Sequence, residues 1–258
     1  MPNWSNTSIM FFSKNKEQLE KLIEDIRDCP RVYHEELEEG FNKLKEDGPG
    51  FKPFGDDWFG TLLYKLGMIT KEQIYEDKIP KHLSCRSRFL NEDYWEDEVV
   101  ADATANPYLD DEMGWHFMIM SEDAWQPYVD TWDQILMEHY PDVQFVYVSE
   151  EPGNGYYCNS DEDRYYFTEN YVLDVMIDEG SASEKVLEQI KDKDELPIEL
   201  YENFSFEDLK HYMKTVFNGF EEVETEDELE AKLAELEELI EYEAYPDDCW
   251  FRLHKFED

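Results

Sequence analysis

The segment Asn159–Asp163 places oxygen-bearing side chains at alternate positions, as the first ligands of a calcium-binding loop do. The rest of that pattern fails, because Arg164 stands where such a loop needs glycine and Asn170 stands where it needs a bidentate glutamate. We therefore interpret the segment as a solvated hairpin turn and keep a calcium site as the alternative. The sequence predicts no metal centre and no cofactor.

Adjacent carboxylates are the usual pairs for general acid–base catalysis, and this chain has them at Asp56-Asp57, Asp110-Asp111-Glu112 and Glu150-Glu151. Because such pairs recur along the chain, their presence singles out no catalytic centre. If the chain is an enzyme, its first candidates are Glu150 and Glu151, at the end of a predicted strand, and the loop around Asp161. The prediction is that it is not an enzyme.

Motifs for nucleotide binding and acyl transfer are absent, since neither GxGxxG, GxxxxGK[ST] nor GxSxG occurs. Gly153 and Gly155 follow Pro152 and are typical of a turn. The six histidines are dispersed and suggest no Ser-His-Asp set.

The charge is the outlying property, because 65 Asp and Glu against 23 Lys and Arg give a formal net charge of -42. Self-repulsion of this size lowers folding stability, so a compensating role is expected. Adaptation to high salt, cation binding and mimicry of a polyanion are the three explanations. Direct nucleic-acid binding is excluded because it requires a Lys/Arg surface, whereas a basic nucleic-acid-binding host protein would fit as partner.

Cys29, Cys85, Cys158 and Cys249 are scattered, with no CxxC pair and no signal-peptide pattern. They predict reduced thiols in a cytoplasmic protein. No apolar run approaches the roughly 20 residues that span a bilayer, so no membrane association is expected.

The strongest functional feature is the acidic segment 221–243, in which Lys232 stands among twelve acidic residues. A solvated helix face is the ordinary interpretation, but here the acids are not balanced by lysines at i+4, since one lysine stands against twelve carboxylates. This imbalance suggests a requirement other than folding. The predicted partner contacts are Glu221, Glu222, Glu224, Asp227, Glu228, Glu230, Glu235, Glu237 and Glu238.

Two tyrosine pairs, Tyr156-Tyr157 and Tyr165-Tyr166, lie in predicted strands, where neighbours point to opposite faces. One of each pair should be exposed, and Tyr156 and Tyr165 are the predicted contacts. Ordinary sheet-surface residues are the equal alternative. Trp125, Tyr128 and Trp132 have helical spacing and are expected in the core.

Hydrophobic periodicity predicts the elements that position these residues. Strands are expected at 1–13, 115–121, 142–153, 155–158, 164–168 and 171–177, and helices at 16–28, 32–45, 56–67 with Asp56 as cap, from Thr70, and at 124–141. The Cys29-Pro30 dipeptide should end the first helix. This order indicates an antiparallel sheet covered by helices.

Residues 178–203 shift to Ser, Lys, Glu and Pro and suggest a boundary, giving a core at 1–202 and an appendage at 203–258. Ser205 should cap one helix to about 218, and the capping box from Thr225 to Glu228 should begin another. Leu229, Leu233, Leu236 and Ile240 on that helix suit a narrow helix–helix seam. The segment CWFRLHKF should add a short final strand.

Three segments, MPNWSNTS, SEDAWQPYVDTWDQILMEHYP and SEEPGNGYYCNSDEDRYYFTENYVLD, occur in this order and resemble the phage and plasmid proteins that carry the YubB ferredoxin-like domain. The resemblance spans about residues 1–178. It implies a ferredoxin-like α+β core and an origin in a mobile element such as a phage. It brings no catalytic residues, and it does not extend to the acidic appendage.

The sequence thus predicts an α+β protein: a ferredoxin-like antiparallel sheet covered by helices, with an acidic, mostly helical appendage. The predicted function is that of a phage-encoded inhibitor of a host defence system, such as a CRISPR effector, restriction enzyme or other nuclease, whose basic channel it occupies as an acidic nucleic-acid mimic. The alternative is a non-catalytic acidic scaffold that joins proteins through its tyrosine-rich sheet and its C-terminal helix seam.

Overall fold

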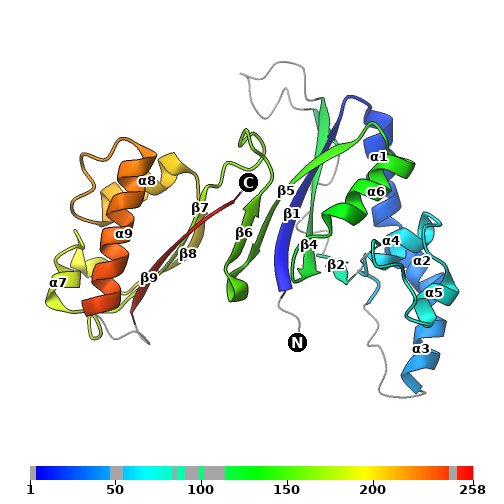
Figure 1. Cartoon of the computed structure of the whole chain (residues 1–258), viewed down its shortest axis with the longest axis horizontal. Coiled ribbons are helices and arrows are strands. Elements are labelled where there is room, and N and C mark those ends of the chain that lie inside the picture. The colour runs from blue at the N-terminus through cyan, green and yellow to red at the C-terminus, as the bar shows by residue number, and fades with distance from the viewer. Residues whose placement is uncertain are drawn as a thin grey trace. The chain divides into compact units, whose positions relative to one another are not determined.

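The computed structural model describes residues 4–46, 55–83, 86–90, 99–101, 114–243 and 249–257. The chain divides into two compact units, Met1–Tyr156 and Tyr157–Asp258, called here the first and second units. Each combines an antiparallel sheet with helices (Figure 1). The predicted α+β class is therefore confirmed.

The first unit begins with a long strand and alternates helices and strands. Its sheet has the order β2-β4-β1-β5-β6, with the short β3 paired to β4, and β6 begins at the last residue of this unit. The elements are β1 Trp4–Ser13, α1 Lys16–Arg27, α2 Cys29–Val32, η1 Tyr33–Leu37, α3 Glu38–Glu46, α4 Gly60–Lys65, α5 Lys71–Tyr75, β2 Ser87–Phe89, β3 Val100–Ala101, β4 Trp115–Ala124, α6 Val129–His139, β5 Gln144–Glu151, η4 Pro152–Asn154 and β6 Tyr156–Asn159.

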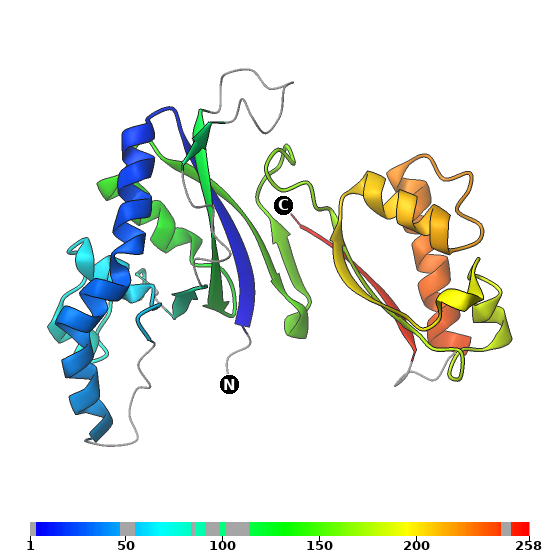
Figure 2. The same ribbon diagram turned by 180° about the vertical axis from the view of Figure 1, so that it is seen from behind.

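Strand alternation sets which face of this sheet is buried. Ile9 and Phe11 of β1 lie opposite Ile119 and Phe117 of β4, and all four are almost fully buried. α1 and α6 lie on one side of these strands in both views (Figures 1 and 2). Trp132 of α6 places its ring 4.9 Å from that of Phe11, so the helix seals the core over the sheet.

The helix predicted at 16–28 is confirmed as α1, with its Leu and Ile stripe buried. The expected end at Cys29-Pro30 is also confirmed, because α1 ends at Arg27 with Asp28 as its C-cap. A second helix, α2, begins at once, and Pro30 occupies its first turn, where a missing N–H is tolerated. α2 continues through η1, a π-helical stretch, into α3. The 32–45 helix is thus present but not uniform.

Two predicted helix starts have different outcomes. Thr70 caps α5, and both hydrogen bonds of its capping box with Gln73 are present, as predicted. Asp56 caps no helix: α4 begins at Gly60 with Phe59 at its N-cap position. The prediction at Asp56 failed because Trp58 instead forms an isolated bridge to Arg88.

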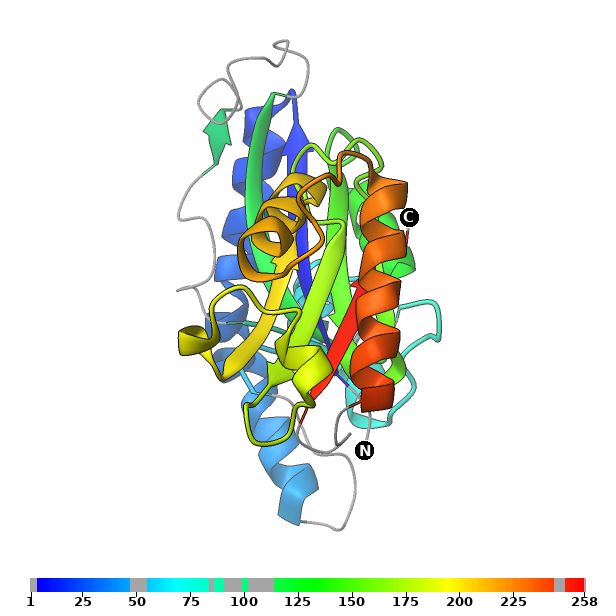
Figure 3. The ribbon, with the colours of Figure 1, turned by 90° about the vertical axis from the view of Figure 1, so that its left-hand side faces the viewer.

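The second unit has a sheet of order β8-β7-β9 with helices on one face. Figure 3 shows α7, α8 and α9 in front of these strands. The elements are β7 Tyr171–Ile177, α7 Glu184–Leu187, η5 Lys193–Glu195, β8 Ile198–Phe204, α8 Phe206–Val216, α9 Glu226–Glu243 and β9 Trp250–Lys255. Ser205 caps α8 and the box from Thr225 to Glu228 opens α9, as predicted.

Several predictions for the second half of the chain differ from the structure. Residues 164–168 form no strand and hold only a bend at Tyr165 and Tyr166, and residues 178–203 hold α7, η5 and most of β8 instead of a linker. The predicted 202/203 boundary falls inside β8, which pairs with β7 over seven residue pairs. The compact units divide earlier, so the acidic helices belong to an α+β unit with its own sheet.

No helix in the described part of the chain is long and apolar enough to cross a membrane.

Candidate functional site

The second unit carries the denser negative charge. The first unit has 33 acidic and 14 basic residues, a formal charge of -19 over 156 residues, whereas the second has 32 and 9, or -23 over 102. The acidic segment 221–243 forms a loop followed by α9. The surplus is therefore large on both units and denser on the smaller one.

The apolar stripe of α9 fixes which of its residues face outward. Leu229, Leu233, Leu236 and Ile240 are 0 to 5 % exposed and belong to the core of the second unit. They pack over the sheet instead of forming the predicted helix–helix seam, because β9 returns beneath α9 as the neighbour of β7. No part of this stripe is available to a partner.

Three of the predicted contact residues bond to neighbouring groups in the loop and the first turn of α9. Glu221 lies 2.8 Å from Lys191, and Glu224 lies 3.2 Å from Lys214. Glu228 accepts hydrogen bonds from the backbone N–H groups of Glu224 and Thr225, which lower its pKa. These carboxylates hold the loop and the helix start in place.

Glu230 is held still more firmly, because it accepts bonds from Lys255 at 2.6 Å and from the Tyr171 hydroxyl at 2.8 Å. The bond from Lys255 is the main cause of its lowered pKa. Glu226 accepts a second bond from Tyr171 at 2.6 Å. Together these contacts pin the start of α9 to the sheet.

The remaining predicted acids are exposed, except for Glu237, which is half-buried. Glu222, Asp227 and Glu238 are exposed and have no ion pair among the described residues. Glu235 is exposed, 3.7 Å from Lys232, whereas Glu237 is half-buried and has a raised pKa because of burial and the nearby Glu241. Glu241, also exposed, was missed. We define the outward acidic set as Glu222, Asp227, Glu235, Glu238 and Glu241.

The tyrosine pairs do not expose one member each. Tyr157 is buried, with its ring centroid 4.4 Å from that of His254, and Tyr156 is half-buried. Tyr165 and Tyr166 are both half-buried and meet edge to face at 4.5 Å. The expected alternation fails for the second pair because no strand forms there.

The Asn159–Asp163 loop is tightly bonded to its own backbone. The Asn159 amide donates to the carbonyls of Phe167 and Glu169, and Asp161 accepts from the N–H groups of Tyr166 and Phe167 at 2.5 and 3.0 Å. Asn159 and Asp161 are buried, so the turn is not solvated at these positions. Their oxygens are already used in closing the loop.

The adjacent carboxylates do not converge on a reaction centre. Glu150 pairs in register with Asn6, and Glu151 is the next residue of the same strand, so the two side chains leave opposite faces of the sheet. Asp56 lies 3.2 Å from His34, whereas Asp57 is partly buried and has a raised pKa for that reason. The Asp110–Glu112 group lies outside the described residues.

Trp132 and Trp125, both expected in the core, differ in burial. Trp132 is buried under α6 as expected, but Trp125 precedes that helix with φ at 80° and is 51 % exposed. The prediction from helical spacing was wrong for Trp125, because α6 begins only at Val129.

A strand of the first unit's sheet, β4, carries a buried carboxyl that the sequence analysis did not identify. Asp123 is 3 % exposed and accepts hydrogen bonds from the hydroxyls of Ser87, Thr7 and Ser121. Burial raises its pKa, and the three hydroxyls oppose that shift. Thr7 also bonds Ser149 at 2.9 Å, so the carboxyl ends a hydroxyl chain across three strands. Only strand register assembles this cluster.

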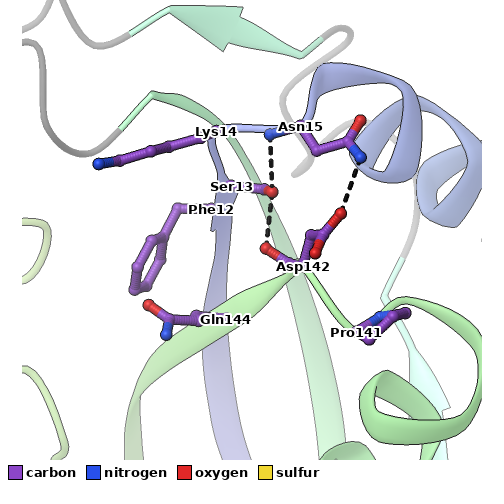
Figure 4. A pocket seen from close by; sticks show the side chains of 7 residues that line it. All are labelled: Phe12, Ser13, Lys14, Asn15, Pro141, Asp142 and Gln144. Carbon is purple, nitrogen blue, oxygen red and sulfur yellow. Dashed lines mark hydrogen bonds between the residues drawn. The ribbon is translucent and has the colours of Figure 1, made fainter.

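A hollow lies at the turns after β1 and α6, and hydrogen bonds join several of the residues that line it (Figure 4). Asn15 donates its backbone N–H to Ser13, whose hydroxyl donates to the Asp142 carbonyl at 2.7 Å. The Asn15 amide reaches the Asp142 carboxylate at 2.8 Å. These bonds join the two turns and leave this carboxylate engaged.

Comparison with protein-family models, curated proteins and solved structures finds no match to this chain. Among the described residues, no group of three or more His, Cys, Asp or Glu could hold a metal ion.

Proposed function

We propose that the protein is a non-catalytic inhibitor that presents the outward acidic set to the basic nucleic-acid channel of a host defence protein, such as a CRISPR effector, restriction enzyme or other nuclease. The observation that carries the proposal is the acidic face of α9, where five exposed carboxylates, whose one ion pair among the described residues is the 3.7 Å contact of Glu235 with Lys232, stand on the unit with the denser charge.

The spacing of these carboxylates fits this role. Glu235, Glu238 and Glu241 recur every three residues, or about 4.5 Å along a helix axis. Each DNA strand presents one phosphate per roughly 3.4 Å of its axis. A channel lined with Lys and Arg would meet a similar row of negative charge, and association would be fast and strongly salt dependent.

The first unit would be the scaffold of such an inhibitor. Its strand order β2-β4-β1-β5, with helices after β1 and β4, supports a ferredoxin-like arrangement and the resemblance to phage proteins of the YubB type. An acidic scaffold that joins proteins through the Leu229-to-Ile240 stripe is disfavoured, because that stripe is buried.

The test is capture of proteins from a nuclease-treated bacterial lysate at low and high salt. One variant neutralises the outward acidic set by Glu→Gln and Asp→Asn. A matched variant removes the same number of exposed carboxylates from the first unit, namely Glu17→Gln, Glu24→Gln, Glu72→Gln, Asp133→Asn and Glu138→Gln.

We expect a nucleic-acid-binding protein to be retained by the wild type and by the matched variant, and to be lost with the α9 variant. Equal retention by all three chains, or recovery only of ribosomal and other abundant basic proteins, would refute the proposal.

A further inference from the structure

The segment 78–91 is a basic island in an acidic chain. It contains Lys78, Lys81, His82, Arg86 and Arg88 and no acidic residue, although the chain has 65 of them. Two of the five are neutralised, because Arg88 pairs with Glu122 and Lys78 with Glu76. Lys81, His82 and Arg86 have no ion pair with any residue that the structure describes and are exposed.

A cavity of about 380 Å³ in the first unit is lined by this island. Lys81 and His82 form one wall of the cavity. Residues 126–131, which lead into α6 and form its first turn, make another, and Tyr147 and Tyr156 complete the lining. This volume lies within the range of small-ligand sites, at its lower end. The cavity is wholly within residues of the first unit.

Basic side chains with no ion pair to a described residue distinguish this cavity from another basic hollow of the same unit. That hollow contains Arg31, Lys65 and Lys71. There Arg31 and Lys65 share Asp28 at 2.7 and 2.8 Å, and Lys71 lies 3.4 Å from Glu36. Its cations are already neutralised within the protein, whereas the residues that the structure describes offer no carboxylate to Lys81 or His82 within ion-pair distance.

The wall that carries the cations is anchored at both ends. Leu83 is 3 % exposed in the core, and its N–H donates to the Pro80 carbonyl at 2.9 Å, which closes the turn that holds Lys81 and His82. On the other side, the Tyr128 hydroxyl donates to the Arg86 carbonyl at 3.3 Å. The basic side chains therefore project from a fixed frame, which lowers the entropic cost of binding.

We propose that this cavity binds a small phosphate monoester with a planar ring, of the nucleoside monophosphate class. Lys81 and His82 would hold the phosphate by charge-assisted bonds, and the rings of Tyr128, Tyr147 or Tyr156 would contact the planar group. The net charge of -42 does not forbid this, since charges beyond about 8 Å are largely screened at physiological salt. Asp130 also lines the cavity and opposes the phosphate.

This inference concerns the first unit and is independent of the proposed function of α9. It is tested with the full chain by calorimetric titration with adenosine 5′-monophosphate, adenosine and inorganic phosphate separately. We expect the monophosphate to bind more tightly than either part alone. The Lys81→Gln/His82→Gln variant should bind it about tenfold more weakly, and Asp130→Asn should bind it more tightly.

The matched control is Lys43→Gln/His211→Gln, which changes an exposed Lys and an exposed His elsewhere, and it should bind like the wild type. Circular dichroism confirms that each variant folds. The inference is overturned if the monophosphate shows no saturable binding, if adenosine binds as tightly, or if the control variant loses as much affinity as Lys81→Gln/His82→Gln.

Discussion

The two units use their carboxylates differently. In the first unit, cations pair with many of them: Lys65 bridges Asp25 and Asp28, and the bonds from Arg31 and Lys65 hold the pKa of Asp28 far below its usual range. In the second unit, Lys210 pairs with Glu207 and Arg252 lies 3.6 Å from Asp174, but within the acidic segment 221–243 the pairing is confined to the loop before α9 and its first turns. From Glu235 onward, the ion pairs of the described residues of α9 reduce to the 3.7 Å contact between Glu235 and Lys232. The comparison teaches that both units carry an acidic surplus, but that the outer half of α9 carries carboxylates with little pairing to cations.

The largest effect is expected from the two hydrophobic cores, which consist of separate sets of residues. Leu233→Ala should destabilise the second unit by about 3 kcal/mol, because Leu233 is fully buried and leaves a cavity. Leu22→Ala is the matched change in the first unit. Hydrogen exchange should show each loss of protection mainly in its own unit; equal losses in both units would break the comparison.

The buried Asp123 of the first unit gives the next effect, which depends on pH. Because its folded-state pKa is raised, the folded chain binds this proton more tightly than the unfolded chain does. The Asp123 contribution to unfolding free energy should therefore fall as pH rises from its ordinary pKa through the raised one. Asp123→Asn should remove this dependence, as measured by urea unfolding at a series of pH values; an unchanged profile would contradict it.

The anchor of α9 should have a smaller effect. Tyr171→Phe removes the hydroxyl that bonds Glu226 and Glu230 and should cost about 1 kcal/mol. Burial and the hydrogen bonds to both glutamates raise the pKa of the Tyr171 phenol, so spectroscopic titration should find its ordinary alkaline ionisation only after unfolding. Denaturant unfolding measures the first effect, and no loss of stability would show that the two carboxylates are placed by other contacts.

The smallest effect on stability is expected from neutralising the outward acidic set. Removing these like charges should raise the melting midpoint slightly at low salt, and the gain should vanish at high salt. The matched first-unit variant should gain less. A drop in the melting midpoint on neutralising the α9 acids would mean that they have a folding role after all.

Local patterns in the sequence predicted much of the fold. The stripe of α1, the capping boxes at Thr70 and Thr225 and the Ser205 cap depend on residues close in the chain, and all are present. The errors came where distant residues decide. Residues 178–203 resemble a linker in composition, yet β8 forms there because β7 supplies its partner.

The candidate sites show the same division. The acidic segment was visible in the sequence. Which of its carboxylates are paired could not be predicted, because their partners Lys191, Lys214 and Lys255 lie in other elements of the second unit. The Asp123 cluster needs the register of β1, β2 and β4 and had no local signal. The absence of acids at 78–91 was a usable signal for the cation-lined cavity.

The central claim is that the outward acidic set occupies a cationic channel in place of nucleic acid. Its most direct test is displacement of a labelled DNA duplex from the captured partner by the full chain, measured by fluorescence anisotropy over a series of salt concentrations. We predict competitive displacement that weakens steeply with salt, is lost when the α9 acids are neutralised and survives in the matched first-unit variant. Displacement that is indifferent to the α9 acids, or a partner that holds DNA and this chain at once, would contradict the account.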